Sequence, residues 1–322
     1  MSGAVATLQI FDAAATREAL PFERLIPALR AMFAVGCEVP PRHVHEVSSP
    51  DGGRFTSLIM PAWLAGPVSY YGIKTINITP GNAARGLPGL HASYLLYDGR
   101  TGVPLALIDG DQITVRRTAA ASALAASWLA RPDARHLLVV GAGRVARLLA
   151  DAYRVVRPIE RVTVWARCED QAEALADELR GRGIAASATR DLEAAAGEAD
   201  IVSCATLATA PLIQGSWLRR GSHLDLIGSF TPAMREADDA CFAGAALYVD
   251  TPEALQKSGD LLGPLSRGVI RATELRGTLA TLARGEAAGR RNADERTVFK
   301  SVGTALEDLA AAIGVFEARQ LF

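Results

Sequence analysis

The sequence predicts an α/β protein in which a doubly wound parallel sheet is joined to a second, β-rich unit. Three observations lead to this prediction. Short apolar runs alternate with helical patterns over residues 131–250, the run HLLVV at 136–140 leads into a glycine-rich turn, and the first 115 residues show strand patterns broken by Gly, Pro and Asn. A chain of 322 residues is long enough for two domains with separate cores.

The parallel sheet is expected because strands that alternate with helices form right-handed βαβ units, whose strands run in parallel. We expect its strands at 136–140, 161–166, 184–189, 200–206, 223–228 and 246–250, and its helices at 144–156, 169–180 and 191–199.

The β-rich unit is expected from strand patterns at 55–64, 70–80 and 91–110, with DGRTG at 98–102 as a hairpin turn. An Ala-rich helix at 116–130 is expected to bridge the two units, and the last helical pattern, 303–320, to return to the first unit. The predicted domains are therefore residues 1–118 together with 298–322, and residues 119–297.

Composition excludes several classes of function. The net charge of −1 favours neither nucleic acid nor a membrane surface as a partner. No apolar run reaches the roughly 18 residues that a membrane span needs, and no signal peptide is apparent at the N-terminus. The four cysteines are far apart and form no CxxC pair, so we expect no zinc site or other metal centre, no disulfide framework, and a cytoplasmic protein.

The glycine-rich turn is the strongest chemical signal. Gly141-x-Gly143-x-x-Ala146 follows a strand and begins a helix, which is the context of a dinucleotide-binding loop. The first glycine permits the tight turn, and the second lets the backbone, here with Arg144 and Val145, approach a pyrophosphate. The helix N-terminus then supplies N–H groups to that anion. We therefore predict that the parallel sheet is of the Rossmann type.

The end of the second strand bears on the choice of cofactor. An NAD site usually has Asp or Glu there, to bind the ribose 2′-hydroxyl. Here the strand ends in Trp165-Ala166-Arg167, and a guanidinium can pair with a 2′-phosphate. We therefore favour NADP(H), with NAD(H) still possible. The alternative is that Arg167 is a solvated arginine near Glu169 and Asp170.

Three cations of the β-rich unit form a candidate carboxylate clamp: Arg42 in PPRHVHE, Lys74 in GIKTINITPGN and Arg117 in DQITVRRTAA. Arginine can bind a carboxylate through two parallel hydrogen bonds, and lysine adds a point charge. Each of the three, taken alone, is more often a surface charge, and the sequence does not show that they converge.

At these residues the chain resembles the ornithine cyclodeaminase/mu-crystallin family. The resemblance covers nearly the whole chain and rests on the ordered segments MPAWL, GIKTINITPGN, DGRTGVPLALIDGDQITVRRTAA, VVGAGRVA, SHLDLIGSFTPAMRE, LYVDTPEALQKSGD and TVFKSVGTALEDLAAA. It implies a homodimer with a β-rich substrate-binding and dimerisation domain, completed by the C-terminal helix, and a Rossmann domain for NAD(H) or NADP(H).

The resemblance also implies roles for individual residues. Arg42, Lys74 and Arg117 would hold the carboxylate of a small imino-acid or amino-acid substrate, and Lys74 and Arg117 would belong to the catalytic set. The residues expected near the cofactor are Thr118, Gly141, Gly143, Arg144, Val145, Arg167, Thr206, Gly228, Lys300, Val302 and Gly303.

One residue departs from the cyclodeaminase pattern. Cyclodeaminases have an aspartate that serves as acid and base in the turn after the HLDLIG-type strand, and this chain has Phe230 there. The form GSFTPAMRE is instead similar to the proline-forming imine reductases of the family. We therefore expect reduction of Δ1-pyrroline-2-carboxylate or its six-membered homologue to L-proline or L-pipecolate.

Alternatives remain for the function and for two side chains. The chain could be an ornithine cyclodeaminase that uses another acid, or a crystallin-like protein that binds NADPH and a ligand without catalysis. Phe230 could pack against the substrate ring or lie in the core. His91 could help to protonate the imine nitrogen or could be a structural histidine.

Overall fold

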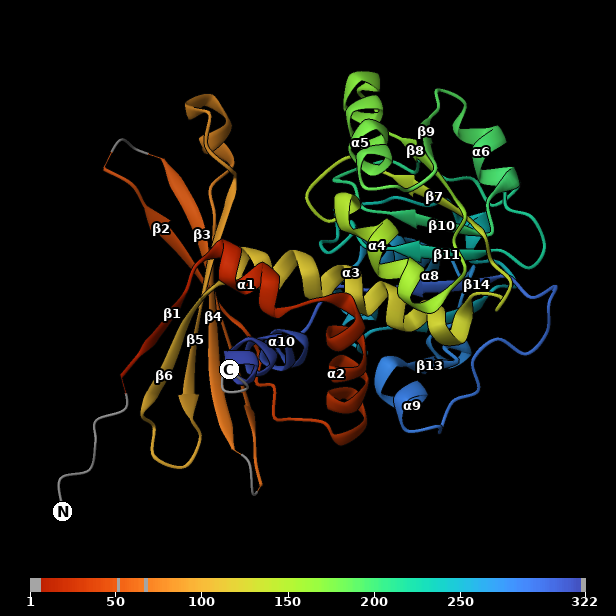
Figure 1. The fold of residues 1–322 in the computed structure, drawn as a ribbon. Coiled ribbons are helices and arrows are strands. Elements are labelled where there is room, and N and C mark those ends of the chain that lie inside the picture. The colour runs from red at the N-terminus through yellow and green to blue at the C-terminus, as the bar shows by residue number, and fades with distance from the viewer. Residues whose placement is uncertain (1–6, 51–52, 67–68, 320–322) are drawn as a thin grey trace, which may run out of the picture. The chain divides into compact units, whose positions relative to one another are not determined.

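The computed structural model describes residues 7–50, 53–66 and 69–319, and divides into two compact units (Figure 1). One comprises residues 1–117 and 304–322, and the other residues 118–303. The boundary therefore falls at 304 and not at 298, because strand β14 (Thr297–Lys300) lies inside the parallel sheet. No helix among the described residues has the length and apolar character needed to cross a membrane.

The first unit is built on a six-stranded sheet of order β1-β6-β5-β4-β3-β2. Its strands are β1 (Gln9–Phe11), β2 (His43–Ser48), β3 (Arg54–Leu64), β4 (Tyr70–Ile78), β5 (Leu90–Asp98) and β6 (Pro104–Asp109). The strands β2 to β6 pair antiparallel, and β1 pairs parallel to β6. The hairpin predicted at DGRTG is confirmed: Asp98 accepts hydrogen bonds from the N–H groups of Arg100 and Thr101 there.

Among the described residues, three α-helices lie wholly within the first unit: α1 (Ala13–Ala19), α2 (Phe22–Val35) and α10 (Ala305–Ala318). A 3-10 helix, η1 (Pro80–Arg85), joins β4 to β5. Helix α10 lies on one face of the sheet, where it contacts β3 and β4 and also packs against α2 (Figure 1). The unit is thus discontinuous in sequence.

The opposite face of this sheet, which we call the open face, carries a row of apolar side chains. Direct cross-strand neighbours on it are Pro61, Ile73, Leu95, Leu107 and Ile10. A second row consists of the rings of Trp63, Tyr71 and Tyr97, in which Tyr71 contacts both of the others. Ile10 is 68% exposed and Leu107 37% exposed, so the open face leaves apolar surface in contact with solvent.

The second unit is built on an eight-stranded parallel sheet of order β13-β12-β14-β11-β10-β7-β8-β9. Its other strands are β7 (His136–Val140), β8 (Arg161–Trp165), β9 (Ala186–Ala188), β10 (Ile201–Cys204), β11 (His223–Leu226), β12 (Ala246–Val249) and β13 (Gly277–Thr278). From β7 the chain proceeds through β8 to β9 and then returns to the other side of β7 as β10. The strand order therefore reverses between β7 and β10, where open α/β sheets bind ligands at the carboxyl ends of their strands.

Helices cover both faces of the parallel sheet. They are α4 (Ala146–Val156), α5 (Glu169–Gly181), α6 (Leu192–Glu198), α7 (Ala254–Lys257), α8 (Gly259–Ser266) and α9 (Leu279–Ala283), together with the 3-10 turns η2 (Asp239–Cys241) and η3 (Ala272–Glu274). Helix α3 (Gly110–Leu129) begins in the first unit and continues into this one.

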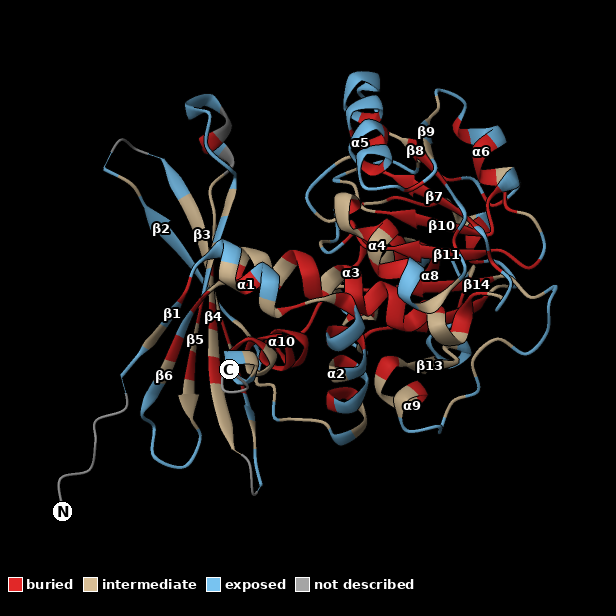
Figure 2. Ribbon diagram, in the orientation of Figure 1, coloured by how far each residue is buried: buried red, intermediate tan, exposed pale blue. Residues whose placement is uncertain are grey.

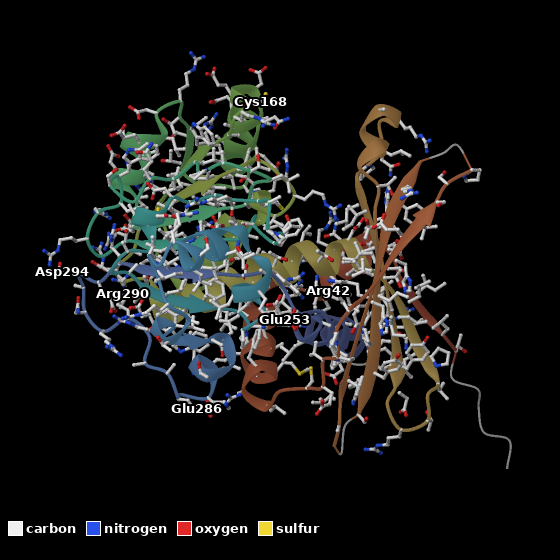
Figure 3. The ribbon with its side chains drawn as sticks, turned by 180° about the vertical axis from the view of Figure 1, so that it is seen from behind. Arg42, Cys168, Glu253, Glu286, Arg290 and Asp294 are labelled. Carbon is white, nitrogen blue, oxygen red and sulfur yellow. The ribbon has the colours of Figure 1, made fainter. Side chains whose placement is uncertain are left out.

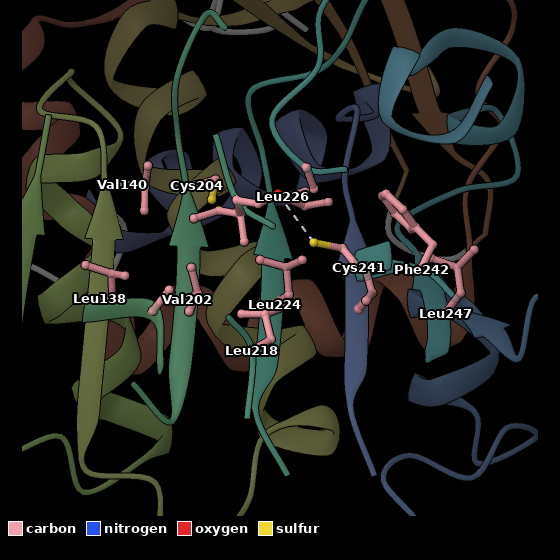
Figure 4. Packing of buried hydrophobic residues seen from close by; sticks show 14 of the residues in the cluster. Leu138, Val140, Val202, Cys204, Leu218, Leu224, Leu226, Cys241, Phe242 and Leu247 are labelled. Atoms are coloured by element: carbon pink, nitrogen blue, oxygen red, sulfur yellow. Dashed lines mark hydrogen bonds between the residues drawn. The ribbon is translucent and has the colours of Figure 1, made fainter. Parts of the chain in front are cut away.

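The core of the second unit lies on both faces of the parallel sheet. Strand residues Leu138, Val202 and Leu224 pack in one cluster with residues of α6, α7 and α8 (Figures 2 and 4). On the opposite face, the carboxylate of Asp225 accepts hydrogen bonds from Ser122 on α3 and Tyr153 on α4. Burial of both strand faces gives continuous apolar runs, which is why these strands were recognisable in the sequence.

The structure differs from the sequence-based expectations mainly at short elements. Strand β14 was not predicted, because TVFK is four residues long and follows the polar stretch NADER. Helix α3 begins at Gly110 and not at 116, and β9 is shorter than the expected 184–189.

Candidate functional site

The turn after β7 has the conformation that its glycines predict. Gly141 has φ +119, and an added Cβ would lie 2.6 Å from the carbonyl oxygen of Ala205. Gly143 and Arg144 are exposed, and Val145 caps α4, whose first residue Ala146 is buried. The loop therefore presents backbone and the N-terminus of an 11-residue helix to solvent, an arrangement that binds phosphate.

The carboxyl ends of β10 and β11 are joined by a buried carboxylate that the sequence analysis missed. Glu236 is fully buried, and one of its oxygens, Oε1, accepts hydrogen bonds from the N–H of Thr206 at 2.7 Å and from its hydroxyl at 2.8 Å. The other, Oε2, accepts from the N–H of Gly228 at 2.6 Å. Burial and the nearby Asp260 raise the pKa of Glu236 to about 7, with Lys300 opposing the shift.

Two further buried groups hold the neighbouring strand ends. Asp250, which follows β12, accepts hydrogen bonds from the N–H groups of Val302 at 2.7 Å and Gly303 at 2.6 Å. Lys300 is fully buried, and its Nζ donates to the carbonyl of Leu226 at 2.9 Å and lies 3.6 Å from Asp260 Oδ2. The ammonium of Lys300 is therefore committed to the protein interior, while Val302 and Gly303 contribute backbone at the site.

Arg167 and Cys168 are exposed beyond the end of β8 (Cys168 is labelled in Figure 3). Glu169 pairs with Arg190 at 2.6 Å and not with Arg167. Among the described residues we find no ion pair for Arg167. A pocket at the start of α5 is lined by Glu169, Asp170, Glu173, Thr189 and Arg190 among others.

The first unit contains a buried cluster of four charges, which we call the ionic quartet: Lys74, Arg117, Glu307 and Asp308. Lys74 Nζ lies 2.5 Å from Asp308 Oδ2. Arg117 Nη1 lies 2.5 Å from Glu307 Oε2, and its Nε donates to Asp308 Oδ1 at 3.0 Å. The structure brings Lys74 and Arg117, two of the three cations of the candidate clamp, to the same pair of acidic residues on α10.

Burial has a strong effect on the quartet. Lys74, Glu307 and Asp308 have no exposed surface, while 8% of Arg117 is exposed. Burial lowers the pKa of Lys74 to about 8; the ion pair with Asp308 opposes this shift, and the charge of Arg117 adds to it. Two cations and two carboxylates balance, which lowers the cost of burying each charge.

The other predicted site residues of this unit are more dispersed. Lys74 faces α10 together with its cross-strand neighbour Tyr94, whereas His91 pairs with Asn77 on the open face. Because side chains alternate along a strand, His91 does not join the quartet. Arg42 is half-buried just before β2 (Figure 3), and Thr118 is half-buried on α3.

Phe230 follows β11 in the turn that begins at Gly228, and 44% of its surface is exposed. It therefore does not lie in the core. The neighbouring Ser229 is buried and donates its hydroxyl to the carbonyl of Met234. The turn thus offers no titratable side chain at residues 228–231.

Comparison with known proteins identifies the family. Residues 14–320 match the model of the ornithine cyclodeaminase/mu-crystallin family. The chain belongs to this family. It is 49% identical over 259 residues to Δ1-pyrroline-2-carboxylate reductase of Paracoccus denitrificans, covering 80% of this chain and 81% of that protein.

Two solved structures superpose on nearly the whole chain. Thermococcus litoralis Δ1-pyrroline-2-carboxylate reductase in complex with NADH and L-proline has a TM-score of 0.90 and 32% identity, covering 98% of each chain. An archaeal alanine dehydrogenase dimer with bound NAD has a TM-score of 0.89 and 29% identity, covering 98% of this chain and 96% of that one. The predicted family and Rossmann-type fold are thereby confirmed.

Proposed function

We propose that this protein is a nicotinamide-dependent reductase of small cyclic imino acids, converting Δ1-pyrroline-2-carboxylate or its six-membered homologue to L-proline or L-pipecolate. The observation that carries the proposal is the turn after β11, which presents Phe230 in place of an acid. Reduction of a preformed imine needs a hydride and one proton, which the imine nitrogen can take from water. Cyclodeamination needs several proton transfers, each of which benefits from a positioned acid or base by typically 10²–10⁴-fold.

The two cations of the ionic quartet would bind the substrate. We propose that Lys74 and Arg117 attract the substrate carboxylate, with Arg42 contributing a further charge. Arg117 is the member of the quartet with exposed surface, so it would make the first contact. The exposed ring of Phe230 would add apolar contact with the substrate ring, worth about 1–2 kcal/mol.

The cofactor would bind at the loop after β7 and at the carboxyl ends of the neighbouring strands. When bound, the nicotinamide supplies the hydride. Gly141, Gly143 and the start of α4 would hold the pyrophosphate, and the backbone at Thr206, Gly228 and Val302 would lie towards the nicotinamide. The two structural relatives contain NAD or NADH, but the exposed Arg167 of this chain leads us to propose a preference for NADPH.

We also propose that the protein is a homodimer and works in the reducing cytoplasm. The open face of the six-stranded sheet supports the first proposal, because contiguous apolar rows on a surface usually mark an interface. The alanine dehydrogenase relative is a dimer. The four cysteines, all unpaired in the structure, fit the second proposal.

A steady-state assay tests the proposed function. The purified protein should oxidise NADPH when given Δ1-pyrroline-2-carboxylate or its six-membered homologue, and should release negligible ammonia from L-ornithine with NAD. Ammonia release at a rate comparable with imine reduction would favour a cyclodeaminase that uses another acid. Binding of NADPH without turnover of either substrate would favour a non-enzymatic, crystallin-like protein.

A further inference from the structure

We propose that Glu236 is a positioning residue, whose single carboxylate fixes the backbone at the ends of β10 and β11 in the arrangement that receives the nicotinamide. The inference rests on the proposed function only in taking these strand ends as the cofactor site. Glu236 belongs neither to the glycine-rich loop after β7 nor to the ionic quartet.

The geometry shows how one side chain can hold two strand ends. Glu236 accepts three hydrogen bonds, two from Thr206 after β10 and one from Gly228 after β11. An added Cβ at Gly228 would lie 2.4 Å from Glu236 Oε1 and 2.0 Å from the carbonyl oxygen of Thr206. The two strand ends are therefore packed so closely around the carboxylate that only glycine fits at 228.

Glu236 is itself held from behind by α8. Asp260 Oδ1 accepts hydrogen bonds from the N–H of Glu236 at 2.8 Å and from the N–H of Ala237 at 3.1 Å. Asp260 is in turn anchored by its own N–H, which donates to the hydroxyl of Ser229. The backbone of Glu236 is therefore held in place by Asp260, while its carboxylate is held by Thr206 and Gly228. Side chains supported in this way keep the geometry of a site.

The ionised carboxylate of Glu236 can accept a hydrogen bond from all three donors, the N–H and hydroxyl of Thr206 and the N–H of Gly228. A protonated carboxyl would place a hydrogen on an oxygen that already faces an N–H group. In Glu236→Gln, the side-chain NH2 group would replace one carboxylate oxygen and would face the donors of either Thr206 or Gly228. An unpaired buried N–H is costly, so the strand ends would move apart to find other acceptors. Such a movement would change the cofactor site without removing any residue from it.

Binding of the cofactor to the Glu236→Gln variant tests the inference. The probe is NADPH, whose fluorescence reports binding directly and without any substrate. The dissociation constant of the variant should rise at least about tenfold, as expected for loss of more than one hydrogen bond in the supporting backbone. Asp225→Asn is the matched control, because Asp225 is an equally buried carboxylate of the same sheet that accepts hydrogen bonds from the side chains of Ser122, Tyr153 and Ser203. The dissociation constant of Asp225→Asn for NADPH should differ from that of the parent protein by less than about threefold.

The pH dependence gives a readout that a purely structural role would not move. The charged or titratable groups that face Glu236 are Lys300 from β14, Asp260 from α8 and Cys204 from β10. Since the pKa of Glu236 is raised to about 7, the ionised form is gained as pH rises through that value. Affinity for NADPH in the parent protein should therefore increase with pH through about 7 relative to Glu236→Gln. The 2′-phosphate of NADPH titrates equally in both proteins and cancels in this ratio.

The outcomes are separable. Unchanged binding by Glu236→Gln, an equal loss in Asp225→Asn, or parallel pH profiles of the parent and Glu236→Gln proteins would overturn the inference. If Glu236→Gln does not fold, Glu236→Asp replaces it: the shorter side chain should weaken binding while keeping the pH dependence, and unchanged binding would again overturn the inference.

If the parent protein binds neither NADPH nor NADH, the proposed function fails, and the inference fails with it. If the parent binds NADPH and Glu236→Gln does not, the inference stands even where no imine is reduced.

Discussion

Adjacent arginines on α3 have different environments. Arg116 donates its Nε to the carbonyl of Leu20 at 2.7 Å and lies over the ring of Phe22, whereas Arg117 belongs to the ionic quartet. This pair offers a matched comparison for the carboxylate clamp.

We predict that Arg117→Met raises the KM for the imino acid by roughly 10- to 150-fold, since a charge-assisted contact of about 1.5–3 kcal/mol is lost. NADPH binding, measured alone, should change much less. Arg116→Met should lower thermal stability without a selective effect on the imino-acid KM. Parallel losses of substrate and cofactor binding in Arg117→Met would mean that Arg117 supports the fold or the cofactor.

Arg167 decides the predicted choice of cofactor. Because its guanidinium is exposed and unpaired within the described residues, it is available to a 2′-phosphate. NADPH should exceed NADH in kcat/KM by roughly tenfold or more, and Arg167→Asp should erode or reverse that preference. Arg161→Asp, at the amino end of the same strand, serves as the control and should leave the ratio unchanged. Equal use of both cofactors by the parent protein would refute the role given to Arg167.

The lowered pKa of Lys74 predicts a loss of substrate binding at high pH. The ammonium is present below about pH 8 and is lost as the pH rises through that value, so attraction for a carboxylate falls over the same range. Pyrrole-2-carboxylate is a suitable probe because its ring nitrogen does not titrate there. Its competitive inhibition constant should rise above about pH 8 in the parent protein. In Lys74→Met the constant should be high throughout and insensitive to pH; a rise that persists in the variant would assign the titration to another group.

At the scale of elements, α10 and β14 show what sequence patterns can and cannot reveal. The strands β7, β8 and β10 were predictable because both faces are buried and their sequences are continuously apolar. Strand β14 has a polar residue at each end, Thr297 and Lys300, whose side chains find partners only in the folded sheet. Helix α10 was predictable as a helix, but the sequence does not reveal which cations pair with Glu307 and Asp308.

The acidic residues of the site carried a signal that pattern reasoning passed over. Glu307 and Asp308 are adjacent carboxylates in an otherwise apolar helix, GTALEDLAAA, and such a pair implies cationic partners if the helix is buried. Glu236 is the last residue of the segment GSFTPAMRE, and Asp250 directly follows the apolar strand β12. Glu236 holds groups of Thr206 and Gly228, and Asp250 holds the N–H groups of Val302 and Gly303. No sequence pattern links these residues, so only the fold reveals which groups the two carboxylates hold.

The packing of α10 depends on the balance of charge in the quartet. Asp308→Asn leaves Lys74 without its ion-pair partner at a fully buried site, and should lower the free energy of unfolding by about 3–5 kcal/mol. The double variant Lys74→Met with Asp308→Leu should recover much of this loss, because it removes both charges together. Urea denaturation of the parent protein, Lys74→Met, Asp308→Leu and the double variant forms a double-mutant cycle. A coupling energy near zero would contradict the ion pair at 2.5 Å.

For the whole molecule, the open face of the six-stranded sheet predicts the assembly. A two-fold dimer pairs the same patch from two copies, so a single charged substitution acts twice at the interface. Leu107→Glu should convert the dimer to monomer in light scattering at micromolar concentration. Val155→Glu is the control, because Val155 has the same 37% exposure but lies on α4; it should leave the mass unchanged. A parent protein that is monomeric at all concentrations would refute the proposed interface.

The most direct test of the proposed reaction follows the hydride. The protein is incubated with Δ1-pyrroline-2-carboxylate and NADPH in which both hydrogens at nicotinamide C4 are deuterium, and the product is examined by mass spectrometry and chiral chromatography. We predict L-proline with a single deuterium, at the carbon that bears the carboxylate, because hydride attacks the imine carbon directly. Formation of unlabelled proline, or no proline from the imine while L-ornithine yields proline and ammonia, would contradict the proposed reaction.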